Sequence, residues 1–248
     1  MNLFWLFLII PVAYLIGSFN NAIFISHFFK RKGATKTEIT EKGSGNPGTM
    51  NMWRSYGFLP AIVVFILDVA KGLLPCLAIW LIFRDSETAL FRFEKLNNTM
   101  QFGILATGLA VIIGHMHPIF YKFKGGKGAA STVGILFFLN PIVGVVVFLI
   151  ALAAFIITRY GFVPSIVFIV GWCIWELVAC IIDGTNGWVI ALMFLFAVNT
   201  LWAHRNNFKR LFNGTEKRFN FKKKSLDPDT AELVDAEKLI APVKKDTK

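Results

Sequence analysis

Long apolar segments separated by shorter polar ones fill most of the chain. The apolar segments cover residues 3–29, 58–83, 100–114, 129–158, 162–182 and 188–203. A helix needs about 20 apolar residues to cross a hydrocarbon core about 30 Å thick, and several of these segments approach or exceed that length. The first segment is not followed by a cleavage pattern of small residues, so we expect it to be retained as one helix. The pattern predicts an all-α, polytopic integral membrane protein.

The basic residues gather in two of the polar regions. Residues 30–56 contain six Lys or Arg and residues 204–248 contain twelve, whereas residues 84–98 balance three basic against three acidic side chains. Because Lys and Arg concentrate in cytoplasmic loops, the first helix should end on the cytoplasmic side, and the C-terminus should lie there too. Six helices would leave the C-terminus outside, so the number of spans should be odd.

The long apolar segment at residues 129–158 contains Asn140-Pro141 near its middle. Proline removes a backbone donor and clashes with the preceding turn, so we predict two helices here and about seven in all, with the N-terminus outside and the C-terminus cytoplasmic. Residues 130–139 are too few to span at about 1.5 Å per residue. That short helix should be sheltered by its neighbours or enter partway from the inner face. A single kinked span is the alternative.

The composition agrees with a membrane protein. Hydrophobic residues occupy 55% of the 248 positions, against about 45–50% in ordinary soluble domains. All three cysteines fall in apolar segments without a C-x-x-C pair, as expected of small buried side chains. We expect one membrane-embedded domain, residues 1–221, and a charged, flexible cytoplasmic tail, residues 222–248.

The first polar segment with candidate chemistry is GSGNPGTMNMWR, residues 43–54. Its glycines match the G-x-G-x-x-G spacing of a dinucleotide site, but no strand precedes them, which excludes a Rossmann fold. Glycines let backbone N–H groups approach an anion, and the polar side chains that can assist are Ser44, Asn46, Asn51 and Arg54. An ordinary glycine turn explains this first segment equally well.

The second segment is GHMHPIFYKFKGGKGAAS, residues 114–131. Its central residues are Lys124, Gly125, Gly126, Lys127 and Gly128. The spacing differs from a Walker A loop, yet two cations beside flexible backbone at a helix start favour a phosphate site. A basic cytoplasmic loop would explain the lysines but not the glycines. Because His115 and His117 lack a third ligand at a metal-binding spacing, no metal site is predicted.

The third segment is AHRNNFKRLFNGTE, residues 203–216, which follows the last apolar helix. If that helix continues, His204 and Asn207 share a face, and Arg205 adds positive charge. A basic collar at the membrane surface is the alternative. Within the apolar segment 58–83, Asp68 and Lys71 are three positions apart, and we predict a structural ion pair that neutralises both charges.

Together these segments resemble a known family. GSGNPGTMN with Arg54, LDVAKG, GHMHPIFYKFKGGKGAAS and HRNNFKRLFNGTE, with AYLIGS near the N-terminus, are similar to the successive motifs of the bacterial acyl-phosphate:glycerol-3-phosphate acyltransferases, the PlsY family. The resemblance implies a seven-helix enzyme of the plasma membrane, with its active site facing the cytoplasm and no cofactor. Such an enzyme transfers a fatty acyl group from acyl phosphate to the 1-hydroxyl of glycerol 3-phosphate, giving lysophosphatidic acid and inorganic phosphate.

The resemblance also implies roles for individual residues. The expected catalytic residues are His204, Asn207 and Lys127. Those expected to bind substrate or phosphate are Ser44, Gly45, Asn46, Asn51, Arg54, Lys124, Gly125, Gly126, Gly128, Ser131 and Arg205. The proton of the acceptor hydroxyl goes either to His204 or to a phosphate oxygen of the substrate, and both routes stay open. The expected partners are the two substrates, membrane lipid and the soluble enzyme that makes acyl phosphate, but no nucleic acid.

Two other classes compete with this interpretation. No histidine is followed by Asp at the fifth position, which disfavours the acyltransferases with an H-x-x-x-x-D motif that use acyl-CoA or acyl carrier protein. A transporter or channel for an organic phosphate would use the same basic segments, with Asp68 and Lys71 along its path. Transporters often show inverted repeats and helices interrupted at matching positions, whereas this sequence shows one interruption and no repeat.

Overall fold

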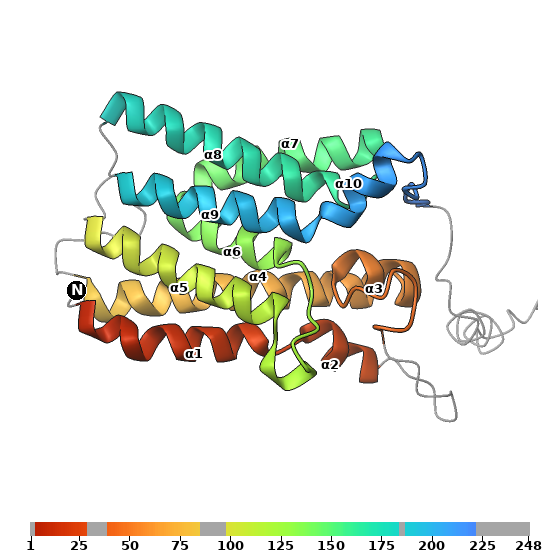
Figure 1. Ribbon diagram of the computed structural model, residues 1–248, viewed down its shortest axis with the longest axis horizontal. Coiled ribbons are helices and arrows are strands. Elements are labelled where there is room, and N and C mark those ends of the chain that lie inside the picture. Colours follow the sequence, from red (N-terminus) through yellow and green to blue (C-terminus); the bar gives the residue numbers. More distant parts are fainter. Residues whose placement is uncertain (1–2, 29–38, 85–97, 184–186, 222–248) are drawn as a thin grey trace, which may run out of the picture. The chain divides into compact units, whose positions relative to one another are not determined.

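The computed structural model describes residues 3–28, 39–84, 98–183 and 187–221, and every regular element within these ranges is a helix (Figure 1). The α-helices are α1 (Leu6–Ser18), α2 (Asn21–Phe28), α3 (Thr49–Tyr56), α4 (Phe58–Phe83), α5 (Asn98–Met116), α6 (Ala129–Leu139), α7 (Pro141–Thr158), α8 (Val163–Asp183), α9 (Gly187–Ala203) and α10 (Arg205–Phe212). The chain forms two compact units, Met1–Asn21 with Phe65–Phe219 and Ala22–Val64 with Asn220–Lys248. The tail expected at residues 222–248 lies outside the described residues.

The first unit is a bundle of helices that pack side by side. Helix α1 packs on α5, α5 packs on α6 and α9, and α8 packs on both α7 and α9 (Figure 1). Its apolar core includes the fully buried side chains of Cys76, Ile104, Ile135, Leu136 and Trp172. Large apolar side chains such as Ile142 and Ile157 are about four-fifths exposed, at 78% and 80%. Outward-facing apolar side chains of this kind are expected where lipid covers the surface, because lipid tails are as apolar as leucine.

Glycines bring pairs of these helices into backbone contact. A Cβ atom at Gly17 would lie 2.1 Å from the Val111 carbonyl oxygen, and a Cβ at Gly114 would lie 2.2 Å from that of Tyr14. Helices α1 and α5 therefore touch at two glycines. Close packing of this kind holds helices together in lipid, where the burial of apolar surface contributes little to the association of helices.

The long apolar segment divides into two helices, as predicted. Helix α6 ends at Leu139, and the Asn140 side chain caps α7 by accepting a hydrogen bond from Val143 N at 3.2 Å. Pro141 takes the first position of α7, where no intrahelical N–H bond is lost. The 11 residues of α6 include six buried ones, so this short helix is sheltered by its neighbours.

Residues 3–29 were predicted as one span, and Leu6–Phe28 is indeed long and apolar enough to cross a membrane, but it is divided into two helices and is not a single one. Helix α1 ends at Ser18, Phe19 is extended, and α2 begins at Asn21. The break has a partner on α4, because Lys71 Nζ donates hydrogen bonds to the carbonyl oxygens of Gly17 at 3.3 Å and Phe19 at 2.9 Å. The buried ammonium thus takes the place of the backbone N–H groups that would have bound these carbonyls if the helix had continued.

Within the described residues, four segments are long and apolar enough to cross a membrane: Leu6–Phe28, Phe58–Phe83, Met100–Tyr121 and Pro141–Thr158. Helices α9 and α10 would count as a fifth if taken together, and Ala129–Leu139 and Val163–Ala179 are shorter apolar helices. The count of seven spans and the orientation of the two termini stay predictions.

Candidate active site

The second segment folds back onto the end of α5. Gly125 N donates a hydrogen bond to Met116 O at 3.1 Å, and Gly126 N donates one to His115 O at 3.0 Å. A Cβ atom at Gly126 would lie only 2.0 Å from His115 Nε2, so a larger residue does not fit there. Gly128 then turns the chain into α6 with a φ of +76°. The glycines thus form a defined turn against His115, from which Lys127 emerges.

Lys127 joins the second segment to the third. Its Nζ donates a hydrogen bond to Asn207 Oδ1. Asn207 Nδ2 donates to one oxygen of Glu216 at 2.7 Å, and Arg210 Nε donates to the other at 2.5 Å. An ammonium only donates and a carboxylate only accepts, so these two neighbours determine which way the Asn207 amide faces. The Glu216 side chain is 5% exposed and balances the positive charge around it.

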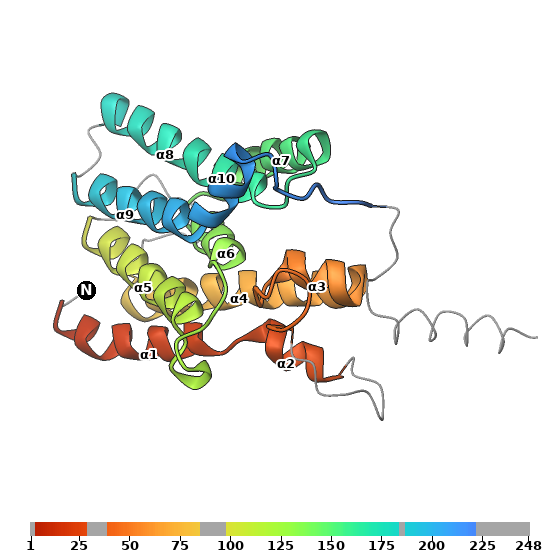
Figure 2. The ribbon, with the colours of Figure 1, turned by 45° about the vertical axis from the view of Figure 1, so that its right-hand side comes forward.

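His204 lies at the break between α9 and α10, whose axes differ by 52°. Figure 2 shows the change of direction between these two helices. The helix therefore does not continue straight through this point, which was the condition for His204 and Asn207 to share one helical face. The two residues nevertheless lie together, because Asn207 N donates to His204 O at 2.8 Å. His204 is 2% exposed, and its Nδ1 lies 2.9 Å from Thr200 O. Since a carbonyl only accepts, Nδ1 carries the proton and Nε2 is left as the acceptor.

The surroundings of His204 favour the neutral imidazole. The residue follows Ala203, the last residue of the apolar helix α9. Burial and, next in size, the nearby Lys127 ammonium lower the pKa of His204 to about 4, although the hydrogen bond to Thr200 O and the Glu216 carboxylate act in the opposite direction. A neutral Nε2 at physiological pH can accept a proton from a bound hydroxyl group.

Acidification should destabilise the wild-type protein more than a His204→Gln variant. The folded pKa of His204 lies below its ordinary value, so between the two values the unfolded chain binds a proton that the folded chain does not. Stability is therefore lost as the pH falls through this window. From about pH 7 to about pH 5 the extra loss should be about 2 kcal/mol. Thermal unfolding in detergent measures it, and equal losses in the two proteins would contradict the lowered pKa.

Three other residues predicted for the site lie elsewhere in the first unit. Ser131 is fully buried in α6, where its carbonyl oxygen would lie 2.1 Å from a Cβ at Gly72. Arg205 donates to Trp202 O at 2.8 Å and lies 4.7 Å above the Trp202 ring. Lys124 is exposed. Within the described residues, the hydrogen bonds therefore link Lys127 to Asn207 and do not include Ser131 or Arg205.

The first segment belongs to the second unit, and Asn51 organises it. Asn51 Nδ2 donates to the carbonyl oxygens of Ile39 at 3.0 Å and Lys42 at 2.9 Å, and its Oδ1 accepts from Ser44 N at 2.9 Å. A Cβ at Gly43, whose φ is +59°, would lie 2.2 Å from Asn51 Oδ1. Both amide protons of Asn51 are used within the chain, so this side chain shapes the segment.

Helix α3 follows directly and was not predicted from the sequence. Arg54 lies in its last turn. Gly45 has a φ of +71°, and the exposed Ser44 lies on the turn between Gly43 and Gly45. Because Ser44, Asn46 and Arg54 belong to a different compact unit from Lys127, their approach to the second and third segments stays a prediction.

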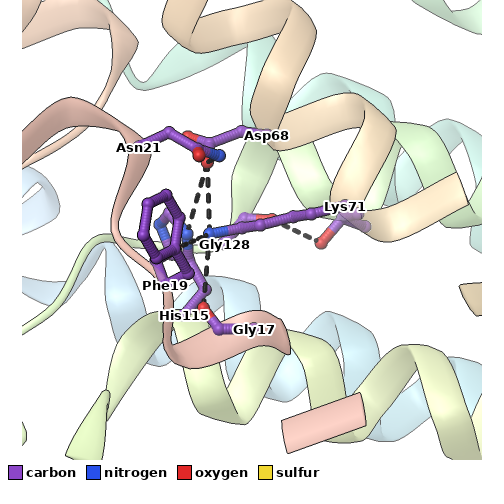
Figure 3. Close-up of polar contacts among 8 residues, drawn as sticks. Gly17, Phe19, Asn21, Asp68, Lys71, His115 and Gly128 are labelled. Carbon is purple, nitrogen blue, oxygen red and sulfur yellow. Dashed lines mark hydrogen bonds and ion pairs between the residues drawn. The ribbon is translucent and has the colours of Figure 1, made fainter. Parts of the chain in front are cut away.

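The side chains of Asp68 and Lys71 meet inside the bundle. Lys71 Nζ lies 3.2 Å from Asp68 Oδ1, and Asn21 Nδ2 donates to the same oxygen at 2.8 Å (Figure 3). Asp68 is 2% exposed and Lys71 is 8% exposed. Buried charges are tolerated when they are paired and hydrogen-bonded, and both conditions are met here. In the part of the chain that the structure describes, no three His, Cys, Asp or Glu side chains lie close enough to hold a metal ion.

The site combines the chemistry of an anion-binding site with that of a proton acceptor. Lys127 supplies a positive charge, and it precedes the N-terminus of α6, whose first N–H groups and dipole also favour an anion. The neutral His204 lies beside the Asn207 amide that Lys127 contacts. The arrangement suits a phosphate-bearing substrate with a hydroxyl group that must lose its proton.

These features define an all-α integral membrane protein with a cationic site at the ends of its apolar helices. The family model for glycerol-3-phosphate acyltransferase matches residues 7–214. The chain belongs to the glycerol-3-phosphate acyltransferase family, and it is an integral membrane enzyme that acylates glycerol 3-phosphate.

Relatives and solved structures give the same result. A glycerol-3-phosphate acyltransferase of Halalkalibacterium halodurans is 32% identical, over 91% of this chain and 100% of the relative. The glycerol-3-phosphate acyltransferase of Francisella tularensis subsp. mediasiatica is 34% identical, over 88% of this chain and 95% of the relative. The crystal structure of PlsY, an integral membrane glycerol 3-phosphate acyltransferase, in its glycerol 3-phosphate form has a TM-score of 0.70 and 30% identity, over 92% of this chain and 98% of that one. The structure of PlsY in its lysophosphatidic acid form has a TM-score of 0.69 and 31% identity, over 87% of this chain and 95% of that one.

Two residues of the site were missed by the reasoning from sequence. Glu216 binds both Asn207 and Arg210, and the Thr200 carbonyl fixes the tautomer of His204. The sequence signal for Glu216 is Gly214, because glycine readily adopts a positive φ in a turn. In the structure its φ is +68°, and the turn brings the chain back toward α10. A backbone carbonyl such as that of Thr200 leaves no mark in the sequence.

Proposed function

We propose that the protein transfers a fatty acyl group from acyl phosphate to the 1-hydroxyl of glycerol 3-phosphate, giving lysophosphatidic acid and inorganic phosphate. The observation that supports it most strongly is the hydrogen bond from Lys127 to Asn207, beside the neutral His204. Both substrates carry a phosphate group and one must lose a proton, which are the two demands that this site meets.

In the proposed reaction the oxygen of the 1-hydroxyl attacks the acyl carbonyl carbon. The new C–O ester bond forms, the bond from that carbon to the phosphate oxygen breaks, and the electron pair leaves with inorganic phosphate. His204 Nε2 or a phosphate oxygen of the substrate takes the hydroxyl proton. Because acyl phosphate is an activated mixed anhydride, the protein supplies mainly orientation and stabilisation of charge. Lys127 stabilises the negative charge on the departing phosphate.

The proposed site faces the cytoplasm, with the enzyme in the plasma membrane. The basic residues support this placement, because Lys and Arg mark cytoplasmic loops, and both glycine-rich segments lie next to such residues. Acyl phosphate would then arrive from the cytoplasmic side, where the soluble enzyme that makes it is the expected partner, while its acyl chain stays in the lipid.

Acyl phosphate should support turnover where acyl-CoA does not. Purified protein in detergent or lipid is supplied with labelled glycerol 3-phosphate and either donor, without added metal or nucleotide, and labelled lysophosphatidic acid is measured. The absence of an H-x-x-x-x-D motif is the reason to expect discrimination between the donors. Product from acyl-CoA alone would overturn the assignment of the donor.

The same preparation separates the enzyme from a transporter. In vesicles that contain the protein, uptake of labelled glycerol 3-phosphate without any acylated product would favour transport. The structure supports the enzyme, because Asp68 and Lys71 are buried, paired and hydrogen-bonded and so are poorly suited to line an ion path.

A further inference from the structure

His115 lies between the buried ion pair and the glycine turn. It is the penultimate residue of α5 and is 4% exposed. On one side its Nδ1 lies 3.8 Å from Asp68 Oδ1. On the other side its carbonyl oxygen accepts the hydrogen bond from Gly126 N, and its Nε2 would lie 2.0 Å from a Cβ at Gly126. The imidazole ring therefore fills the space between α4 and the turn.

The ion pair gives this ring a fixed support. Asp68 Oδ1 is held by Lys71 and Asn21, and Lys71 is held in turn by the carbonyl oxygens of Gly17 and Phe19 (Figure 3). Three acceptors thus surround the ammonium, one for each of its protons. Moving either charge would leave the other buried without its counter-charge, which is strongly unfavourable. Figure 3 shows His115 lying beside this cluster.

The glycine turn packs closely against His115. A Cβ at Gly125 would lie 2.0 Å from His115 O, so the backbone of both glycines rests directly on His115. Lys127 follows Gly126 in the chain and reaches Asn207 from there. A shift of Gly126 therefore moves the ammonium relative to Asn207.

We propose that His115 is a positioning residue. Its ring transmits the position of the Asp68–Lys71 pair to Gly126, and so holds Lys127 within reach of Asn207 and of the phosphate of glycerol 3-phosphate. Among the described residues His115 Nδ1 has no hydrogen-bond partner, so the proposed role rests on the close contact of the ring with Gly126. The inference rests on the proposed function, because it assigns the glycine turn to phosphate binding.

A cycle of Gly126→Ala, His115→Ala and the double variant tests the contact directly. The methyl group introduced by Gly126→Ala collides with the ring, so this variant should raise KM for glycerol 3-phosphate about tenfold or more, with a smaller change in kcat. His115→Ala removes the support and should raise KM about threefold to tenfold. In the double variant the methyl group enters the space left by the ring, so KM should stay near that of His115→Ala.

Independent effects would instead multiply in the double variant, and that outcome would overturn the proposal. A wild-type KM in His115→Ala would overturn it as well, even if Gly126→Ala fails to fold. Thr107→Val is the matched control, because Thr107 lies in the same helix and is 1% exposed, and its hydroxyl has no hydrogen-bond partner among the residues that the structure describes. This variant should keep the wild-type KM.

A second measurement separates this inference from the proposed function. The shift in thermal unfolding on adding glycerol 3-phosphate needs no acyl donor and is recorded for all four proteins. If wild type shows the shift and the cycle shows coupling, but acyl phosphate gives no product, the donor is wrong and the positioning role stands. If turnover is normal but the shifts of the two single variants combine independently, the positioning role is wrong and the proposed function stands. If wild type shows no turnover and also no shift with glycerol 3-phosphate, both the positioning role and the proposed function are overturned.

Discussion

Replacing Lys127 by Ala should lower the rate of acyl transfer by about 10²- to 10³-fold, as is typical when one donor to a developing negative charge is removed. The ammonium contacts Asn207, whose backbone N–H is bound to His204 O, so one substitution removes the proposed phosphate contact and loosens the residues around the proposed proton acceptor. Initial rates with acyl phosphate and glycerol 3-phosphate measure the effect. Both kcat and KM should worsen, because donor and acceptor each carry phosphate.

Lys122→Ala is the control for this prediction. Lys122 lies in the same segment and carries the same charge, but it is exposed and lies before the glycine turn. Its removal should leave the rate unchanged, whereas a purely collective effect of positive charge would lower the rate in both variants. Lys127→Arg should recover only part of the activity, since a planar guanidinium does not reproduce the geometry of an ammonium. A wild-type rate in Lys127→Ala would contradict the role of this residue.

The apolar pattern predicts much of the fold because helix length in a membrane is a local property. The predicted segment 58–83 matches α4, and the division at Asn140 follows from the chemistry of proline alone. The break at Phe19 could not be predicted in the same way. The side chain that binds the open carbonyls there belongs to Lys71, 52 positions away from Phe19, and no feature of the local sequence reports such a partner.

The candidate site shows the same division between local and distant causes. Glycine and lysine in the second segment indicate an anion site by their chemistry, so the sequence alone is enough to propose Lys127 as a candidate. Its contact with Asn207 joins residues 80 positions apart and depends on the packing of the bundle. Asn51 is a second example of a distant cause, because its amide donates both protons to backbone carbonyls 12 and 9 positions away, and its part in substrate binding stays a prediction.

Lys71→Met should be among the most destabilising substitutions in the chain. Lys71 neutralises Asp68 and binds the carbonyl oxygens of Gly17 and Phe19 at the end of α1. Methionine fills a similar volume but leaves the carboxylate buried with Asn21 and without a cation, which typically costs about 3–5 kcal/mol. The fraction of monodisperse protein after extraction and the midpoint of thermal unfolding in detergent measure the loss.

The double variant Asp68→Asn/Lys71→Met decides whether Lys71→Met is destabilised by the unpaired charge of Asp68 or by the lost contacts of Lys71. An amide at position 68 is neutral and can still accept the hydrogen bond from Asn21, so most of the stability should return if the single variant fails through an unpaired charge. Replacing a whole buried pair is often close to neutral, whereas removing one member is not. A double variant no more stable than Lys71→Met would show that the contacts of Lys71 with the carbonyls of Gly17 and Phe19 matter more than its charge. Lys122→Met, at an exposed position, should unfold at the wild-type temperature.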